Sequence, residues 1–272
     1  MFKLPDFPAY YTLLDKLGWY ALRVTAIGVL FYLLLPVVVI IPLSFSDSSF
    51  LAYPIKGWSM QWYEAMWNSD DWARATKNSF IVAPLATLLA TVLGTLAAMG
   101  LANTKFAGKG FITGLLIAPM VVPIVVVGVS SYLYFARWGL NDSYLGLVIV
   151  HAALGAPFVV TTVLATLQGF NHNLIKASLS LGASPLETFF RVTLPVIAPG
   201  VISGALFAFA TSFDEVVVTL FLAGPEQVTL PRQMFTGIRE NISPTIAAVA
   251  TLLTLFTTAL MMTLEWVRGR NK

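Results

Sequence analysis

The chain lacks cysteine altogether and has only two histidines among its 272 residues. The absence of cysteine excludes disulfides and thiol chemistry. Two histidines without cysteine also argue against a zinc or iron site, since such sites are built from these side chains. We therefore interpret His151 and His172 as structural residues and expect no bound metal.

Charged residues are also scarce in the sequence. Only 11% of the residues are charged and 57% are hydrophobic, whereas a soluble domain carries about 25% charged residues. So few charges do not cover a water-exposed surface, so we expect lipid to be the main solvent of the chain. The net charge of +3 comes from basic residues scattered among loops, which gives no indication of nucleic-acid binding.

The N-terminal region lacks the pattern of a cleavable signal peptide. Lys3, Asp6, Asp15 and Lys16 precede the first apolar run, and that run is longer than a signal-peptide core. We expect it to remain as a membrane anchor.

Long apolar stretches are what the sequence has in abundance. A helix needs about 20 apolar residues to cross the hydrocarbon core of a bilayer. Pro119 and Pro123 lie inside the third stretch and predict a kink there. The sequence thus predicts an all-α membrane protein, with a single transmembrane domain over residues 1–272 and six spans at about 19–43, 80–101, 111–135, 144–167, 195–222 and 246–267.

The loops differ in their charge, and this difference predicts the orientation. With six spans, both termini share one side, which carries ten lysines and arginines against six on the other. Four acids lie on the first side and seven on the second. Positive residues favour the cytoplasmic side, so we expect both termini in the cytoplasm.

The cytoplasmic loop between the fourth and fifth spans, residues 171–194, predicts two short helices. In the first, Asn173 is placed to cap a helix over residues 174–181. Gly182 is placed to end it, because glycine accepts the left-handed conformation common after a helix.

The second short helix has a complete start signal. Ser184 is a capping residue, Pro185 fits the first helical position, and Glu187 lies three residues after the cap. This spacing is a capping box. We expect a rigid helix–turn–helix unit that transmits force from a soluble partner to the membrane helices.

This loop resembles the cytoplasmic loop of permease subunits in ABC importers, whose pattern is E-A-A-x-x-x-G-A-x-x-x-x-x-F-x-x-I-x-L-P. Lys176 and Ser178 depart from it, standing where the pattern has glutamate and alanine, and Val192 replaces isoleucine. The resemblance implies a type I importer permease bundle whose loop binds a partner ATPase. The matching residues are Ala177, Gly182, Ala183, Phe189, Leu194 and Pro195.

The chain has no nucleotide-binding loop of its own. A P-loop needs G-x-x-x-x-G-K-[ST], and Gly108-Lys109 is followed by Gly110 and lacks the upstream glycine. We therefore expect a transport subunit rather than an enzyme, with no cofactor bound by this chain. A partner subunit would use ATP and magnesium.

Two adjacent acids, Asp214 and Glu215, lie inside the predicted fifth span. Carboxylates within a membrane helix are costly and usually face a bundle interior or a water-filled path. Thr211, Glu215 and Thr219 recur every four residues, which predicts one polar face on a continuous helix, with Asp214 close to it. The pattern leaves two interpretations: a bond to a neighbouring helix or subunit, or a cation-facing site on a transport path. The two acids are also able to divide these roles.

The segment around these acids resembles the spermidine/putrescine branch of ABC permeases. That resemblance implies a substrate path containing Ser212, Asp214 and Glu215, and a similar outer segment adds Trp62 as a weaker candidate. The branch often has an aspartate after a proline in the third span, but here Ile124 stands at that position. A substrate with fewer amines, such as an opine or another amino compound, is therefore an alternative.

The resemblance also implies partners and a location. These are an ATP-binding subunit dimer, a second permease that is expected to be a paralogue, a periplasmic substrate-binding protein and the bacterial inner membrane. The alternatives from other classes are an ion-coupled secondary transporter and a membrane enzyme. No inverted repeat favours the first, and no nucleophile–base motif favours the second.

Overall fold

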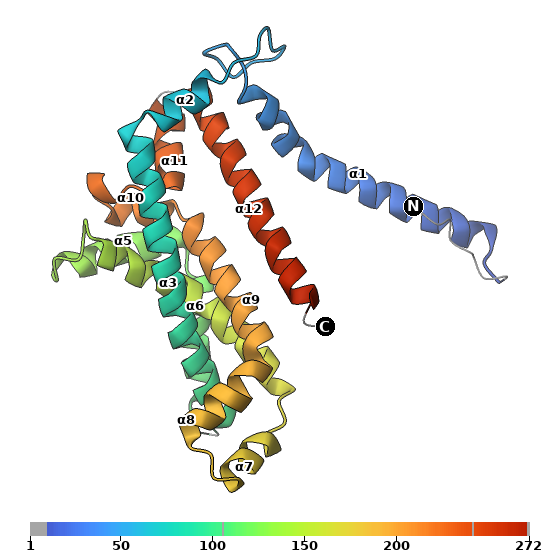
Figure 1. Cartoon of the computed structure of the whole chain (residues 1–272), viewed down its shortest axis with the longest axis vertical. Coiled ribbons are helices and arrows are strands. Elements are labelled where there is room, and N and C mark those ends of the chain that lie inside the picture. The colour runs from blue at the N-terminus through green and yellow to red at the C-terminus, as the bar shows by residue number, and fades with distance from the viewer. Residues whose placement is uncertain (1–9, 105, 241, 271–272) are drawn as a thin grey trace. The chain divides into compact units, whose positions relative to one another are not determined.

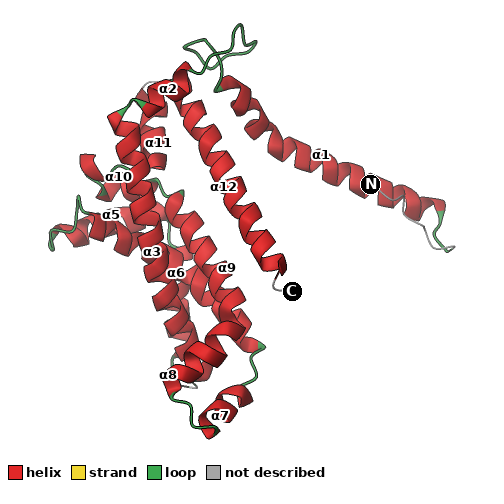
Figure 2. Cartoon of the chain, viewed as in Figure 1, coloured by secondary structure: helices red, strands yellow, loops and turns green. Residues whose placement is uncertain are grey.

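The structure is a computed structural model that describes residues 10–104, 106–240 and 242–270. Every regular element in these ranges is a helix (Figures 1 and 2). Within the same ranges, Ser46 and Trp58 form an isolated antiparallel bridge. The chain divides into two compact units. The first contains α1, most of α2 and most of α12, and the second contains the elements from α3 to α11.

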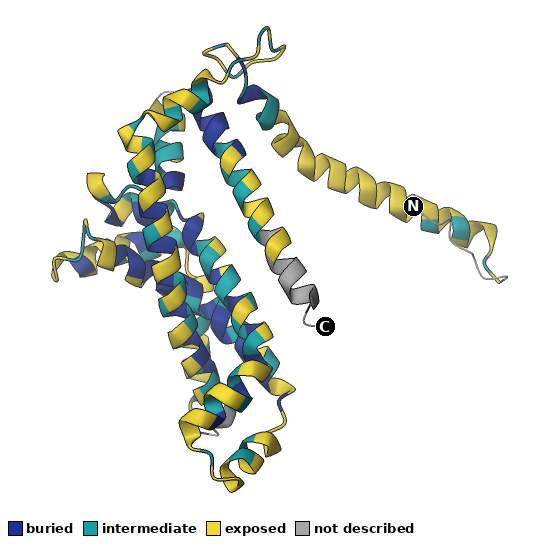
Figure 3. Cartoon of the chain, viewed as in Figure 1, coloured by how far each residue is buried: buried dark blue, intermediate teal, exposed yellow. Residues whose placement is uncertain are grey.

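The first unit contains the two long helices nearest the ends of the chain. Helix α1 (Leu13–Leu43) begins with a capping box between Thr12 and Asp15, and α12 covers Pro244–Arg270. Apolar side chains are exposed along most of α1 (Figure 3). Such a surface suits lipid or the apolar face of another membrane helix, because apolar side chains need no hydrogen-bond partners.

Three helices form the core of the second unit: α3 (Asp70–Asn103), α6 (Tyr144–Gln168) and α9 (Leu194–Phe213). Small residues allow α6 and α9 to approach closely. A Cβ added at Gly155 would lie 2.9 Å from the Cβ of Ala208, and one at Gly204 would lie 2.7 Å from the Cα of Val159. Close packing through small residues is typical of membrane helices.

The predicted third span is not one kinked helix. Helix α4 (Lys109–Ile117) continues into the 3-10 turn η1 (Ala118–Met120), and α5 (Ile124–Ala136) then starts at an angle of 99°. Pro123 precedes α5 as its N-terminal flanking residue. Proline has no N–H to donate and its ring clashes with the preceding turn, so the helix breaks here instead of bending.

The cytoplasmic loop and the segment after α9 contain the shorter helices. Helix α7 covers Asn173–Ser180 and α8 covers Pro185–Thr188. A π-helical segment, η2 (Phe189–Thr193), joins α8 directly to α9, so the second loop helix and the following span form one continuous run. The remaining elements are α2 (Gln61–Trp67), α10 (Val217–Leu222), η3 (Pro225–Gln227) and α11 (Leu230–Glu240).

Among the described residues, four helices are long and apolar enough to cross a membrane, or five if the bent α4–α5 pair is one span. Helix α12 adds a shorter apolar stretch over Pro244–Leu260. The count of six spans and the cytoplasmic location of the termini stay predictions. The fifth span at 195–222 is wrong as a continuous helix, because α9 ends at Phe213 and α10 starts at Val217.

Candidate functional site

The two acids lie at a break between helices. The Asp214 N–H still donates to the carbonyl of Ala210 at 3.0 Å, so Asp214 is the C-terminal flanking residue of α9. Helical structure resumes only at Val217. The predicted polar face of Thr211, Glu215 and Thr219 is therefore wrong, because it required one uninterrupted helix.

Glu215 caps the second helix of this pair. Its side chain is only 7% exposed, and Oε1 accepts a hydrogen bond from the Val218 N–H at 2.7 Å. An anionic oxygen at a helix N-terminus satisfies a free N–H and complements the positive end of the helix dipole. The sequence left two interpretations of the acids, and Glu215 fits the one in which the carboxylate forms a hydrogen bond within the protein. Its partner is a backbone N–H three residues later in the chain.

Asp214 has the opposite surroundings. Its side chain is exposed at the C-terminal end of α9, on the same side as Phe207 and Thr211, which precede it by seven and three residues. The Phe207 ring is exposed on one side and stacks on Phe158 of α6, with the centroids 5.9 Å apart. Both ion pairs found among the described residues involve Arg74, so neither neutralises Asp214.

Ser212 and Thr219 are buried and bind a histidine. The side chain of His151, on α6, is 1% exposed. Its Nδ1 lies 2.9 Å from the Ser212 hydroxyl, and its Nε2 lies 3.3 Å from the Thr219 hydroxyl. Both hydroxyls therefore contact an interior imidazole, although the sequence placed them on the substrate path. One signal for this pairing was present: His151 is the only ionisable residue between Leu145 and Leu167.

Trp62 belongs to the first unit, where it holds the outer segment together. Its indole N–H donates to the carbonyl of Ser46 at 2.8 Å. The neighbouring Tyr63 hydroxyl lies 2.7 Å from the hydroxyl of Ser44. These bonds tie α2 to the end of α1, so Trp62 has a structural contact whether or not it meets a substrate.

The turn and second helix of the cytoplasmic loop follow the predicted chemistry. Gly182 has a positive φ of 88° after α7. The Glu187 N–H donates to the Ser184 hydroxyl at 3.2 Å, and the Ser184 N–H donates to Glu187 Oε2 at 3.0 Å. The capping box is therefore confirmed, and Pro185 occupies the first helical position as expected.

The predicted cap of the first loop helix was misplaced. Asn173 is the first residue of α7, and the flanking residue His172 makes no side-chain capping bond. The Asn173 N–H instead donates a hydrogen bond to the side-chain Oδ1 of Asn171 at 3.0 Å. Asn171 therefore takes the place of the predicted cap. Its side chain bonds to the backbone two residues later, in a local turn of the kind that also occurs at helix N-termini.

Ser178, which departs from the permease pattern, connects the two loop helices. Its hydroxyl lies 3.0 Å from that of Thr188, which is buried. Lys176 and Ala177 are exposed on α7, Ala183 and Phe189 are half-buried, and Pro195 is exposed near the start of α9. Five large apolar side chains also face outward from the loop: Leu174, Leu179, Leu181, Leu186 and Phe190.

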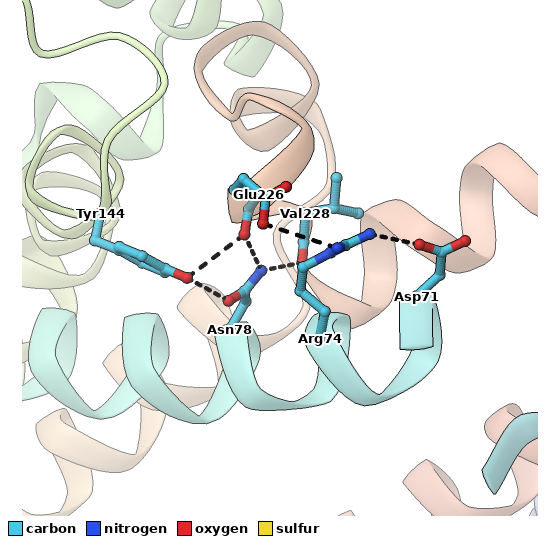
Figure 4. A network of polar contacts seen from close by, with 6 residues as sticks. All are labelled: Asp71, Arg74, Asn78, Tyr144, Glu226 and Val228. Atoms are coloured by element: carbon cyan, nitrogen blue, oxygen red, sulfur yellow. Dashed lines mark hydrogen bonds and ion pairs between the residues drawn. The ribbon is translucent and has the colours of Figure 1, made fainter. Parts of the chain in front are cut away.

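A polar network that the sequence did not indicate holds the segment between α10 and α11 (Figure 4). The Asn78 amide, from α3, donates to the carbonyls of Glu226 and Val228, both at 2.8 Å. The Tyr144 hydroxyl donates to Asn78 Oδ1 at 2.7 Å. Arg74 pairs with Asp71 and with Glu226 at the exposed edge of the network.

A second group of contacts anchors the far end of α10. The Asp142 N–H donates to the carbonyl of Leu222 at 2.9 Å, and the Arg232 guanidinium donates to the carbonyl of Ala223. Burial lowers the pKa of Arg232 from its ordinary value, and the nearby Asp142 carboxylate opposes that shift. Helix α10 is thus held at its end as well as at its start.

The comparisons with solved structures identify the fold. The structure aligns with a bacterial ABC transporter involved in the import of the acidic polysaccharide alginate, with a TM-score of 0.75, 14% identity, and coverage of 96% of this chain and 99% of that chain. The same kind of transporter bound to its periplasmic protein aligns with a TM-score of 0.65 at 18% identity, covering 92% and 91%. The importer-permease fold expected from the sequence is confirmed.

Comparison with known sequences gives closer relatives. The spermidine/putrescine transport system permease protein PotC of Haemophilus influenzae is 31% identical over 88% of this chain and 93% of its own length. The putrescine transport system permease protein PotI of Escherichia coli is 33% identical over 82% and 81%. Residues 90–270 match the family model described as the binding-protein-dependent transport system inner membrane component. The chain belongs to this family of inner-membrane transport components.

Proposed function

We propose that this chain forms part of the translocation path for a polyamine or a related cationic amine. The observation that carries the proposal is the exposed Asp214 carboxylate at the C-terminal end of α9. The relatives named for spermidine and putrescine transport support the same substrate class. As a binding-protein-dependent transport component, the chain is neither of the alternatives from other classes, the membrane enzyme and the ion-coupled carrier.

The electrostatics of the break favour a cation beside Asp214. The C-terminal end of a helix carries a partial negative charge, and the Asp214 carboxylate adds to it. The opposite, positive end at the start of α10 is capped by Glu215. The two acids therefore divide their roles: Glu215 stabilises the break, and Asp214 attracts the ammonium group of the substrate.

Asp214 also indicates which side of α9 faces the path. A carboxylate facing lipid is costly, so a charged residue at membrane depth normally faces protein or water. The exposed Phe207 shares this side of the helix and stacks on Phe158. An aromatic pair two helical turns from a carboxylate, about 10 Å along α9, suits an amine with an aliphatic chain, because the rings contact the methylene groups while the carboxylate binds the ammonium. Transport requires this site to bind its substrate weakly enough to release it.

The cytoplasmic loop supplies the coupling to ATP in this proposal. Lys176 and the exposed leucines of α7 and α8 dock on a dimer of ATP-binding subunits, which use ATP and magnesium while this chain binds neither. The π-helical segment η2 joins α8 to α9 without a flexible linker. A force on the loop therefore reaches the helix that carries Asp214. A periplasmic substrate-binding protein delivers the amine, and a paralogous permease supplies the other half of the path.

Uptake of radiolabelled putrescine or spermidine into proteoliposomes containing the complete importer tests the proposal. Asp214→Asn should lower the initial rate about tenfold or more, since an ion-paired hydrogen bond contributes about 1.5–3 kcal/mol. Asp214→Glu is the matched control and should retain more activity, because it keeps the charge. Normal uptake by Asp214→Asn would contradict a cation site at this residue. Transport of an opine but of neither polyamine would replace the proposed substrate.

A further inference from the structure

One buried imidazole contacts both sides of the α9–α10 break. Ser212 lies two residues before the first of the two acids, and Thr219 belongs to the first turns of α10. His151 lies within hydrogen-bonding distance of both hydroxyls, and all three side chains are at most 5% exposed. We propose that His151 is a positioning residue that fixes the break and thereby keeps Asp214 directed away from the core. The importance of this for transport rests on the proposed role of Asp214.

The direction of Asp214 follows from that of Ser212. The side of α9 packed in the core contains residues spaced three or four apart, and Ser212 is its last member. Residues two apart on a helix lie on nearly opposite sides. A contact that holds Ser212 inward therefore holds Asp214 outward. The other members of the packed side are Ile197, Gly200, Gly204 and Ala208.

A chain of contacts crosses the break where the helical backbone bonds are interrupted. Ser212 contacts His151, His151 contacts Thr219, and the Thr219 hydroxyl reaches the Glu215 carbonyl at 3.3 Å. Helix α6 supplies a firm base, because Gly155, one turn after His151, packs directly on Ala208. The imidazole therefore sets the positions of both helix ends relative to α6.

Histidine suits this place because its two ring nitrogens point in different directions. In a neutral imidazole one nitrogen donates and the other accepts, and a hydroxyl takes either role. Both Ser212 and Thr219 are therefore satisfied without a buried charge. A leucine of similar size would fill the space but would leave both contacts unmade.

The absence of cysteine from the chain allows a direct test. Asp214→Cys places a single thiol at the end of α9, and a water-soluble maleimide reports how accessible that position is in the assembled importer. Adding His151→Leu should change the labelling rate by at least about fivefold, since the loss of a single hydrogen bond changes a population by about that factor and leucine removes two. Adding His151→Gln, which keeps a donor and an acceptor, should restore part of it. Asn68→Cys, exposed after α2 and outside the cytoplasmic loop, is the control and should label equally in all backgrounds.

An unchanged labelling rate at position 214 in the His151→Leu background would overturn the inference. If that variant does not assemble, Ser212→Ala and Thr219→Val each remove one contact and should each shift the rate in the same direction. Unchanged labelling in both would overturn the inference equally. The proposed function is judged separately by uptake in the Asp214→Asn variant, so each idea is able to fail without the other.

Discussion

The cytoplasmic loop and the α9–α10 break are two interruptions built with similar chemistry in different surroundings. Both place a glutamate carboxylate on a backbone N–H near the start of the following helix. At the loop, Ser184 and Glu187 are exposed, and Ser184 caps α8 through its own side chain. At the break, Glu215 is buried and its carboxylate caps α10 directly. In the exposed loop, water is able to replace a hydrogen-bond partner that is lost, but at the buried break it is not. The same kind of hydrogen bond therefore contributes more to stability at the break than in the loop.

The largest effect should follow removal of the buried cap. Glu215→Ala takes away the acceptor of the Val218 N–H, and a buried donor without a partner costs about 1–3 kcal/mol. We expect a clear fall in the melting temperature of the purified protein, measured by its loss of monodisperse elution after heating. Glu215→Gln keeps a carbonyl acceptor and should recover most of the loss. Equal stability of the alanine variant and the parent would show that the cap is not needed.

The second-largest effect is expected at the turn of the cytoplasmic loop. Gly182→Ala puts a Cβ on a residue with φ of 88°, and a left-handed conformation costs about 1–2 kcal/mol for a residue other than glycine. No atom lies within 4 Å of the added carbon, so the cost is conformational and not steric. Uptake should fall more than membrane insertion, because the strain is released by reorienting α7. Gly110→Ala, at a site that is also open but has no positive φ, serves as the control.

The exposed cap should matter less than the buried one. Ser184→Ala removes the side-chain oxygen that accepts from the Glu187 N–H, at a typical cost of about 1 kcal/mol. ATP hydrolysis should become partly uncoupled from uptake, because α8 starts less firmly. Ser184→Asp retains a capping oxygen and should behave like the parent. A melting temperature lowered as far as in Glu215→Ala would contradict the difference between the two regions.

The smallest effect is expected at the contact between the loop helices. Ser178→Ala leaves the Thr188 hydroxyl without its partner on α7, and a neutral hydrogen bond contributes about 0.5–1.5 kcal/mol. The Thr188 hydroxyl is able to turn to a carbonyl of its own helix, which offsets part of the loss. The ratio of ATP hydrolysed to substrate transported should rise slightly. Ser49→Ala, exposed in the segment after α1 and outside the loop, should leave this ratio unchanged.

How far the sequence predicts each region depends on the range of the contacts that build it. The cap at Ser184 and the turn at Gly182 involve residues within a few positions of one another, so their chemistry is readable from spacing. The misplaced cap at Asn173 is also a local error of two positions. No proline or glycine lies at the break after Phe213 that would predict the end of a helix there. The spacing of Thr211, Glu215 and Thr219 also fits an unbroken helix. Sequence periodicity therefore predicted the wrong structure there.

The sequence by itself determined that lipid is the main solvent of the chain and that the chain is a membrane protein. The scarcity of charge and the long apolar stretches require lipid, and the local signals of residues 171–194 predict the coupling unit that membership of the transport family supports. The tertiary structure alone decided which acid is buried and which is exposed. That decision depends on His151, which is 61 residues from Ser212 and 68 from Thr219 in the chain. Contacts over such separations leave no regular spacing in a sequence, so only the packing of α6 against α9 and α10 brings them together.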